Sequence, residues 1–162
     1  MVDRHRPKVL LVVRDPRDVV ISRAHYALDL RKHEWHRAVR ELPDVKDRIR
    51  LFIAGDDRAG IAPIATVLRR YEGWLERSAS VVRFEELVGP GTRVDALDRA
   101  FAELGIPSRR SALERIADRL VSPVSVTFRR GRAGEWSGEF DGELRAAFEG
   151  SAGAVLARYG YS

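Results

Sequence analysis

The stretch KVLLVVRDPRDVVISRAHY, residues 8–26, constrains the fold more than any other part of the sequence. Residues 9–13 form a continuous apolar run, mostly β-branched, which is typical of a strand buried on both faces, as parallel strands are. Asp15 can cap a helix that has Pro16 at its first position, where proline is favoured. A strand, a charged turn and a helix therefore follow one another directly, which predicts the beginning of an α/β fold.

Arg14 and Ser22 are the candidate ligand-binding residues of this stretch. Arg14 ends the predicted strand, and the helical spacing puts Asp18 and Ser22 on the face opposite the apolar stripe. Open α/β sheets bind ligands at the carboxyl edge of their strands, and helix N-termini attract anions. The residues alone leave two alternatives: an anion-binding pair, or an Arg14 paired with a neighbouring aspartate beside a Ser22 that faces water.

A second strand is predicted at residues 80–84, SVVRF, after a helix that begins near Pro63. In that helix, Tyr71 and Trp74 recur at the same spacing as the aliphatic residues, so we expect both aromatic side chains to lie in the core. The order strand, helix, strand indicates a short parallel sheet flanked by helices.

The sequence TFRRGRAGEWSGEF, residues 127–140, is the second candidate site. Its glycines, Gly131 among them, allow the backbone to approach an anion, and its arginines supply charge-assisted hydrogen bonds. The arginines are Arg129, Arg130 and Arg132. The alternative is a basic surface turn whose Trp136 and Phe140 fold back on the core.

Composition narrows the kind of protein. A chain of 162 residues with 44% hydrophobic content is expected to form one domain. The absence of cysteine excludes disulfides and Cys-based zinc sites. His33 and His36 have no third ligand nearby in the sequence and suit a solvated helix, so no metal site is predicted.

The charge distribution favours an anionic ligand. The formal net charge is +5, and arginine, which binds phosphate and carboxylate bidentately, far outnumbers lysine. The alternative is a solvated surface on which arginine replaces lysine; charge alone does not indicate nucleic acid, which we consider an unlikely partner. Residues 9–13 are too short for a membrane span or a signal-peptide core, so we expect a soluble, cytoplasmic protein without a membrane partner.

Three segments together resemble one family. RDPRDVVIS, with Arg14 and Ser22 eight residues apart, resembles the 3′-phosphate-binding segment of the sulfotransferases that use 3′-phosphoadenosine 5′-phosphosulfate. FRRGRAGEW resembles the carboxy-terminal nucleotide loop of that family. VVRFEELVGP resembles its segment with a tyrosine before two acidic residues, and Phe84 stands at the tyrosine position. The resemblance implies that the 3′-phosphate is bound by Arg14, Ser22, Arg129, Arg130 and Gly131.

The resemblance also implies a partial P-loop-like fold, of the nucleoside triphosphate hydrolase type. We expect a single sulfotransferase-like domain over residues 1–162, shortened at its amino terminus relative to the family. The first glycine is Gly55, so residues 1–54 contain no glycine-rich loop for the 5′-phosphosulfate, and no general base is identified. A first strand missing from the sheet leaves residues 9–13 with an apolar edge, which favours pairing with a second copy or with a complementary chain.

The function implied is transfer of a sulfonate group from 3′-phosphoadenosine 5′-phosphosulfate to a hydroxyl or amine, without a metal. The acceptor is expected to be a small molecule or carbohydrate, and its identity stays open because acceptor pockets of this family are built from variable loops. The alternative is a non-catalytic module that binds adenosine 3′,5′-bisphosphate, or half of a split enzyme. Nonspecific nucleic-acid binding through the arginines is a weaker, third hypothesis.

Overall fold

The computed structural model describes residues 7–29, 31–120 and 132–162, and the chain divides into two compact units. The first unit consists of Met1–Arg14 and Gly73–Ala133, and the second consists of Asp15–Glu72 and Gly134–Ser162. The chain passes between the units at three points: just after the first strand, within the helix Ile64–Arg77, and between Ala133 and Gly134.

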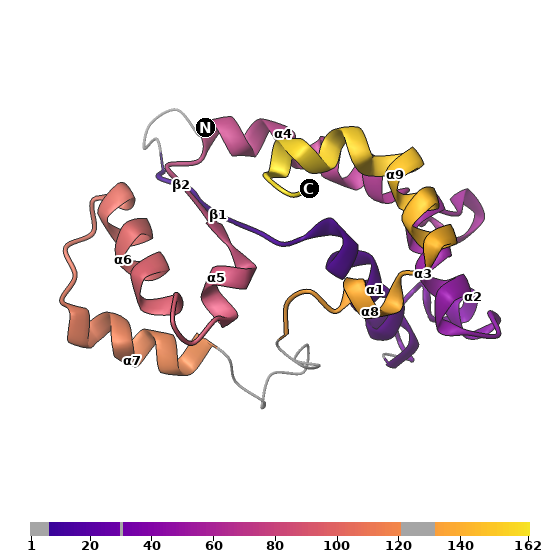
Figure 1. Cartoon of the computed structure of the whole chain (residues 1–162), viewed down its shortest axis with the longest axis horizontal. Coiled ribbons are helices and arrows are strands. Elements are labelled where there is room, and N and C mark those ends of the chain that lie inside the picture. Colours follow the sequence, from indigo (N-terminus) through magenta and orange to yellow (C-terminus); the bar gives the residue numbers. More distant parts are fainter. Residues whose placement is uncertain (1–6, 30, 121–131) are drawn as a thin grey trace. The chain divides into compact units, whose positions relative to one another are not determined.

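The sheet belongs to the first unit. Strand β1 (Leu10–Val13) pairs in parallel with strand β2 (Ser80–Arg83), with Leu10 opposite Ser80, and Figure 1 shows the two side by side. Helix α5 (Phe84–Val88) follows β2 without a gap, and helix α6 (Arg93–Leu104) packs on β2. The predicted fold class, α/β with a short parallel sheet flanked by helices, is confirmed.

The prediction that the first strand is buried on both faces is wrong. Val13 is buried, but Leu10 is 42% exposed and Val12 is 48% exposed. Because partners in a parallel pair point to the same face, Val12 shares its face with Val82. Helix α6 covers Val82 through two small residues, Ala96 and Ala100, and so covers that face over β2 while Val12 stays open to solvent.

The described part of the first unit also contains a helical hairpin. Gly105 ends α6 in the left-handed conformation that favours glycine, with φ of 68°. Helix α7 (Arg110–Leu120) then packs against α6. Leu97, Leu113 and Ala117 form the buried contact between the two helices, while Arg93 of α6 donates from Nη1 to the carbonyl oxygen of Ala117 at 3.0 Å.

The second unit is helical and begins as predicted. Helix α1 (Pro16–Asp29) is capped by Asp15, whose Oδ1 accepts a hydrogen bond from the backbone N–H of Arg17 at 2.9 Å. Its apolar face packs on α3 (Val45–Ala54), which in turn packs on α9 (Gly142–Leu156). The remaining helical segments among the described residues are α2 (His36–Arg40), α4 (Ile64–Arg77), α8 (Trp136–Glu139), η1 (Asp57–Ala59) and η2 (Ala157–Tyr159).

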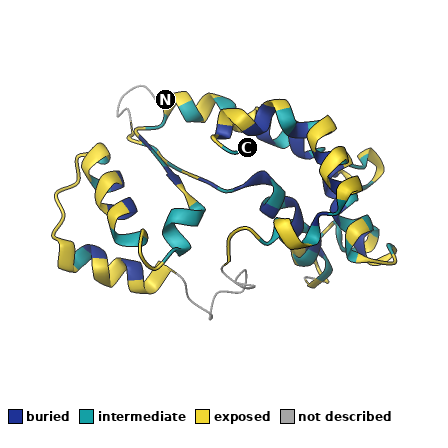
Figure 2. Ribbon diagram, viewed as in Figure 1, coloured by how far each residue is buried: buried dark blue, intermediate teal, exposed yellow. Residues whose placement is uncertain are grey.

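The expectation that the aromatic residues of α4 lie in the core is wrong. Ile64, Ala65 and Leu68 are buried in the amino-terminal half of the helix, but Tyr71 is 53% exposed and Trp74 is 45% exposed. The apolar spacing therefore runs on past the point where other elements cover the helix. Figure 2 shows the burial of each helix along its length.

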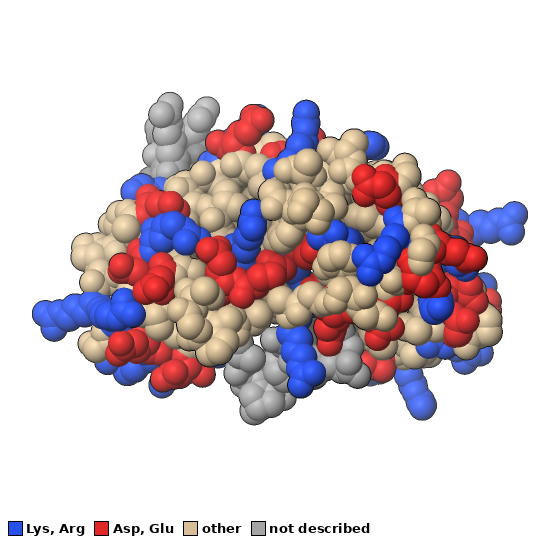
Figure 3. Space-filling model, in the orientation of Figure 1, with Lys and Arg blue, Asp and Glu red and all other residues tan. Residues whose placement is uncertain are grey.

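The surface charge and the hydropathy of the helices were compared with the expectations from composition. Acidic and basic side chains are interspersed over the face shown in Figure 3. No helix among the described residues combines the length and the apolar character needed to cross a membrane.

Candidate functional site

Arg14 lies at the carboxyl end of β1, where its side chain has two identified neighbours in the first unit. Its Nη2 donates a hydrogen bond to the carbonyl oxygen of Arg132 at 3.2 Å. Its guanidinium carbon lies 4.6 Å from the ring centroid of Phe84, which is within cation–π distance. A half-buried guanidinium held at two points has lost much of its rotamer freedom before any ligand arrives.

The ring of Phe84 is placed by the strand-to-helix junction that follows β2. Glu86 accepts a hydrogen bond from the backbone N–H of Arg83 at 3.0 Å and pairs with Arg99 of α6 at 2.9 Å. Burial by itself would raise the pKa of Glu86, but the bonds from Arg83 and Arg99 outweigh it and hold the pKa below its usual value. Glu86 thus acts both as helix cap and as ion-pair partner, and Phe84 begins the helix at the end of the sheet.

Asp18 has a role that the sequence did not reveal. The helical spacing put it on the exposed face of α1, but it is 1% exposed. Its two carboxylate oxygens accept hydrogen bonds from the backbone N–H groups of Gly134 at 2.7 Å and Trp136 at 2.9 Å, all within the second unit. Both donors belong to FRRGRAGEW, the segment that resembles the nucleotide loop, and no local signal in the sequence connects them with Asp18.

Arg17 is a second residue whose partners were not predicted. It forms a bidentate ion pair with Asp15, with Nη2 2.8 Å from Oδ2 and Nε 2.9 Å from Oδ1. Its guanidinium carbon lies 3.7 Å from the ring centroid of Trp136. The RDPRD segment therefore contains two arginines in different environments, one beside Phe84 and one beside Trp136.

The other predicted site residues are Ser22 and the three residues of the carboxy-terminal loop. Ser22 is half-buried on α1, in the second unit, whereas Arg14 belongs to the first. Arg129, Arg130 and Gly131 lie outside the described residues. That these residues surround one phosphate stays a prediction.

Part of the alternative interpretation of residues 127–140 holds in the described portion. Phe140 is buried at 4% exposure and lies 5.9 Å from the ring of Phe148, so it packs on the core as that alternative expected. Trp136 is half-buried, with its ring 6.2 Å from that of Phe140. This packing secures the end of the segment and leaves the nucleotide-binding hypothesis open.

Comparison with known proteins gives a likeness in structure and none in sequence. No family model and no curated protein sequence matches the chain. Among solved structures, the chain is similar to mouse sulfotransferase SULT7A1 complexed with PAP, with a TM-score of 0.69 and 19% sequence identity. The likeness covers 99% of this chain and 65% of that one, so this chain spans less than two thirds of the length of the mouse protein. In its described residues, the chain has a sulfotransferase-like fold.

Proposed function

We propose that this chain supplies the 3′-phosphate site of a sulfotransferase-type protein that uses 3′-phosphoadenosine 5′-phosphosulfate as sulfonate donor. The acceptor is a hydroxyl or amine of a small molecule or carbohydrate. The similar mouse protein is a sulfotransferase complexed with PAP, which agrees with a bisphosphate nucleotide as the ligand.

One contact carries the proposal. Arg14, from the first motif, donates to the carbonyl oxygen of Arg132, which is the residue directly after Gly131 of the second motif. Arg14 and Arg132 are 118 positions apart in the sequence, yet they are hydrogen-bonded within one unit and join the two segments that resemble the family's 3′-phosphate site. If either segment resembled the family only by chance, a hydrogen bond between Arg14 and Arg132 would not be expected.

The residue types suit the proposed task. Arg14 offers a planar fork of N–H donors that matches two phosphate oxygens, and Ser22 offers a hydroxyl donor. Arg129 and Arg130 add charge-assisted donors, and Gly131 allows a backbone N–H to approach the same phosphate. These groups bind the end of the donor opposite the reacting sulfur, so they act through affinity and position of the nucleotide.

The proposed 3′-phosphate site is tested by measuring the thermal shift that three adenosine nucleotides cause. At concentrations near 100 times Kd, adenosine 3′,5′-bisphosphate is expected to raise Tm by roughly 5–10 °C. Adenosine 2′,5′-bisphosphate, which has the same charge, and adenosine 5′-monophosphate are expected to give clearly smaller shifts. Equal responses to all three, or no response to any, would contradict a 3′-phosphate site.

Phe84 provides a further prediction about the same site. Phe84→Leu removes the aromatic face next to Arg14, so the preference for the 3′,5′-bisphosphate over the monophosphate should fall roughly fivefold, in line with a partly buried cation–π contact. Phe84→Tyr keeps the ring and should keep the preference. Calorimetric titration of both variants checks this, and a leucine variant with the full preference would show that the ring does not orient Arg14.

A second candidate is a non-catalytic binding module for adenosine 3′,5′-bisphosphate, or half of a split enzyme. This candidate needs only the nucleotide-binding residues; residues 1–54 contain no glycine and so provide no glycine-rich loop for a 5′-phosphosulfate. Turnover discriminates between the two candidates. Purified protein that transfers sulfonate to a phenol or alcohol with no partner added is an enzyme, whereas nucleotide binding without turnover supports the module.

A further inference from the structure

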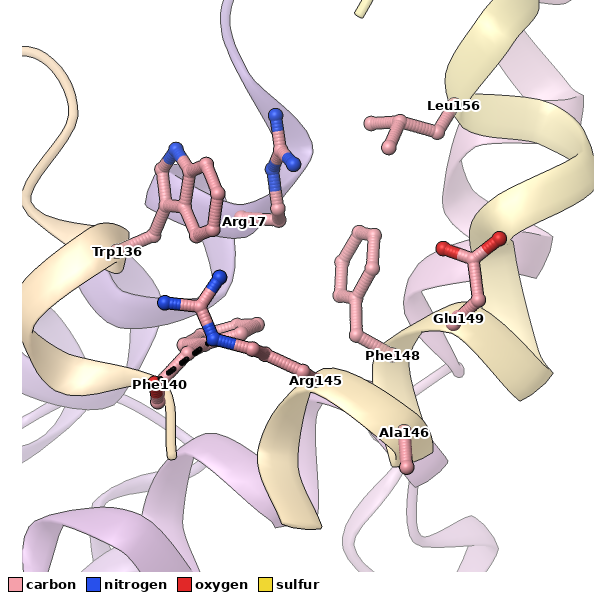
Figure 4. A pocket seen from close by; sticks show the side chains of 8 residues that line it. All are labelled: Arg17, Trp136, Phe140, Arg145, Ala146, Phe148, Glu149 and Leu156. Atoms are coloured by element: carbon pink, nitrogen blue, oxygen red, sulfur yellow. Dashed lines mark hydrogen bonds between the residues drawn. The ribbon is translucent and has the colours of Figure 1, made fainter. Parts of the chain in front are cut away.

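A cavity of about 320 Å³ lies in the second unit and is lined by none of the five predicted nucleotide-binding residues. Residues of α1, α8 and α9, together with Phe140 between the last two, line it, as Figure 4 shows from close by. Phe140, Phe148 and Leu156 are its buried apolar residues, each no more than 4% exposed. Its volume falls at the lower end of the range for small-molecule sites, roughly 300–1,000 Å³.

The indole ring of Trp136 forms one wall of the cavity. The ring of Trp136 carries the guanidinium of Arg17 at 3.7 Å from its centroid. The charge of Arg17 is balanced by its bidentate pair with Asp15. Arg17 therefore holds the Trp136 ring in place and adds little net charge to the cavity.

Arg145 is the cation available to a ligand. Its Nε donates to the carbonyl oxygen of Phe140 at 3.2 Å, and its Nη2 donates to that of Ser137 at 3.1 Å. Carbonyl oxygens orient a guanidinium without cancelling its charge, and among the described residues no carboxylate forms an ion pair with Arg145. Figure 4 shows its guanidinium directed toward Trp136, whose ring centroid lies 5.0 Å away.

Glu149 is the opposing charge at the cavity. It lies four residues after Arg145 on α9, but no ion pair joins the two within the described part of the chain. Figure 4 shows the two side chains directed to different sides of Phe148. A negative group bound at Arg145 therefore meets a favourable cation, with Glu149 as a more distant like charge.

We propose that this cavity binds a small planar aromatic molecule that carries one acidic group. The ring packs on Phe148 and Trp136, and the acidic group accepts hydrogen bonds from Arg145. The apolar residues, the aromatic wall and an oriented but uncompensated guanidinium are the features that such a ligand matches.

Calorimetric titration with two isosteric probes tests the proposal. 2-Naphthoate and 2-naphthamide share their ring system and differ in charge, so naphthoate is expected to bind about tenfold more tightly. Arg145→Gln should remove this preference by weakening naphthoate alone. Glu149→Gln should strengthen naphthoate two- to threefold and leave naphthamide unchanged. Arg37→Gln on α2, where the side chain is 89% exposed, is the matched control and should change neither affinity.

The variants also separate a structural effect from an electrostatic one. Arg145→Gln loses hydrogen bonds to two carbonyl oxygens, so unchanged naphthamide binding is required to show that the cavity stays intact. Arg145→Lys keeps the charge and should keep most of the preference. In ¹H–¹⁵N spectra, the indole N–H signal of Trp136 should shift on titration, which places the ligand in this cavity. Equal affinities of the two probes, or tighter binding of 2-naphthylmethylammonium than of naphthoate, would overturn the proposal.

Discussion

Replacing Arg14 by alanine is expected to abolish the extra stabilisation that adenosine 3′,5′-bisphosphate gives over adenosine 5′-monophosphate. The guanidinium is oriented by the Phe84 ring at 4.6 Å and by the carbonyl oxygen of Arg132 at 3.2 Å. A hydrogen bond to a charged group contributes about 1.5–3 kcal/mol, so loss of a bidentate contact corresponds to roughly 100-fold in affinity or more. The nucleotide without a 3′-phosphate loses nothing from this change.

Two control variants make the Arg14 experiment specific. Arg115→Ala removes the same charge from the exposed face of α7 and should leave both nucleotide affinities unchanged. Arg14→Lys keeps the charge but loses the planar fork, so an intermediate affinity is expected. The Tm of each free variant serves as its own baseline, because Arg14→Ala also removes the contacts with Phe84 and with the Arg132 carbonyl. An alanine variant that still prefers the 3′,5′-bisphosphate by the wild-type factor would exclude Arg14 from the site.

Asp18→Ala is expected to destabilise the second unit by about 3–5 kcal/mol. The carboxylate is 1% exposed and accepts from two backbone N–H groups, at 2.7 Å from Gly134 and 2.9 Å from Trp136. Alanine removes two charge-assisted hydrogen bonds and leaves two donors without their acceptor. Asp18→Asn keeps one carboxamide oxygen as an acceptor, so the expected loss of stability is about half of that in Asp18→Ala.

Urea denaturation and native-state hydrogen exchange check the Asp18 prediction together. Exchange of the Gly134 and Trp136 amides should become much faster in the alanine variant, because these N–H groups lose their acceptor. Asp98→Ala, at an exposed position of α6, is the matched control and should change stability by less than about 0.5 kcal/mol. A loss under about 1 kcal/mol in Asp18→Ala would show that other contacts hold residues 134–136 in place.

Sequence reasoning located the first strand and the start of the helix after it to within a residue. The strand predicted at residues 9–13 is Leu10–Val13, and the helix predicted from Pro16 is Pro16–Asp29 with Asp15 as its cap. These features depend on residues within one or two turns of each other, so composition and spacing report them directly. The motif resemblance likewise depends on nearby residues, and its assignment of Arg14 and Ser22 to a phosphate site stays a prediction.

Burial of individual side chains was not predictable in the same way. Spacing showed which face of α4 is apolar, but Trp74 on that face is 45% exposed, and Asp18 on a polar face is buried. A periodic pattern tells which residues share a face; whether another element covers that face depends on chain far away in the sequence.

By itself, the sequence determined the strand-to-helix unit around Arg14, the parallel pairing of the two strands and the residue types suited to a phosphate. Only the tertiary structure decided which groups surround them: Phe84 and the Arg132 carbonyl beside Arg14, and two amides beside Asp18. The physical reason is the range of the interactions. Caps and periodicity act over a few residues, whereas a donor 116 positions away reaches Asp18 only when the whole unit has folded.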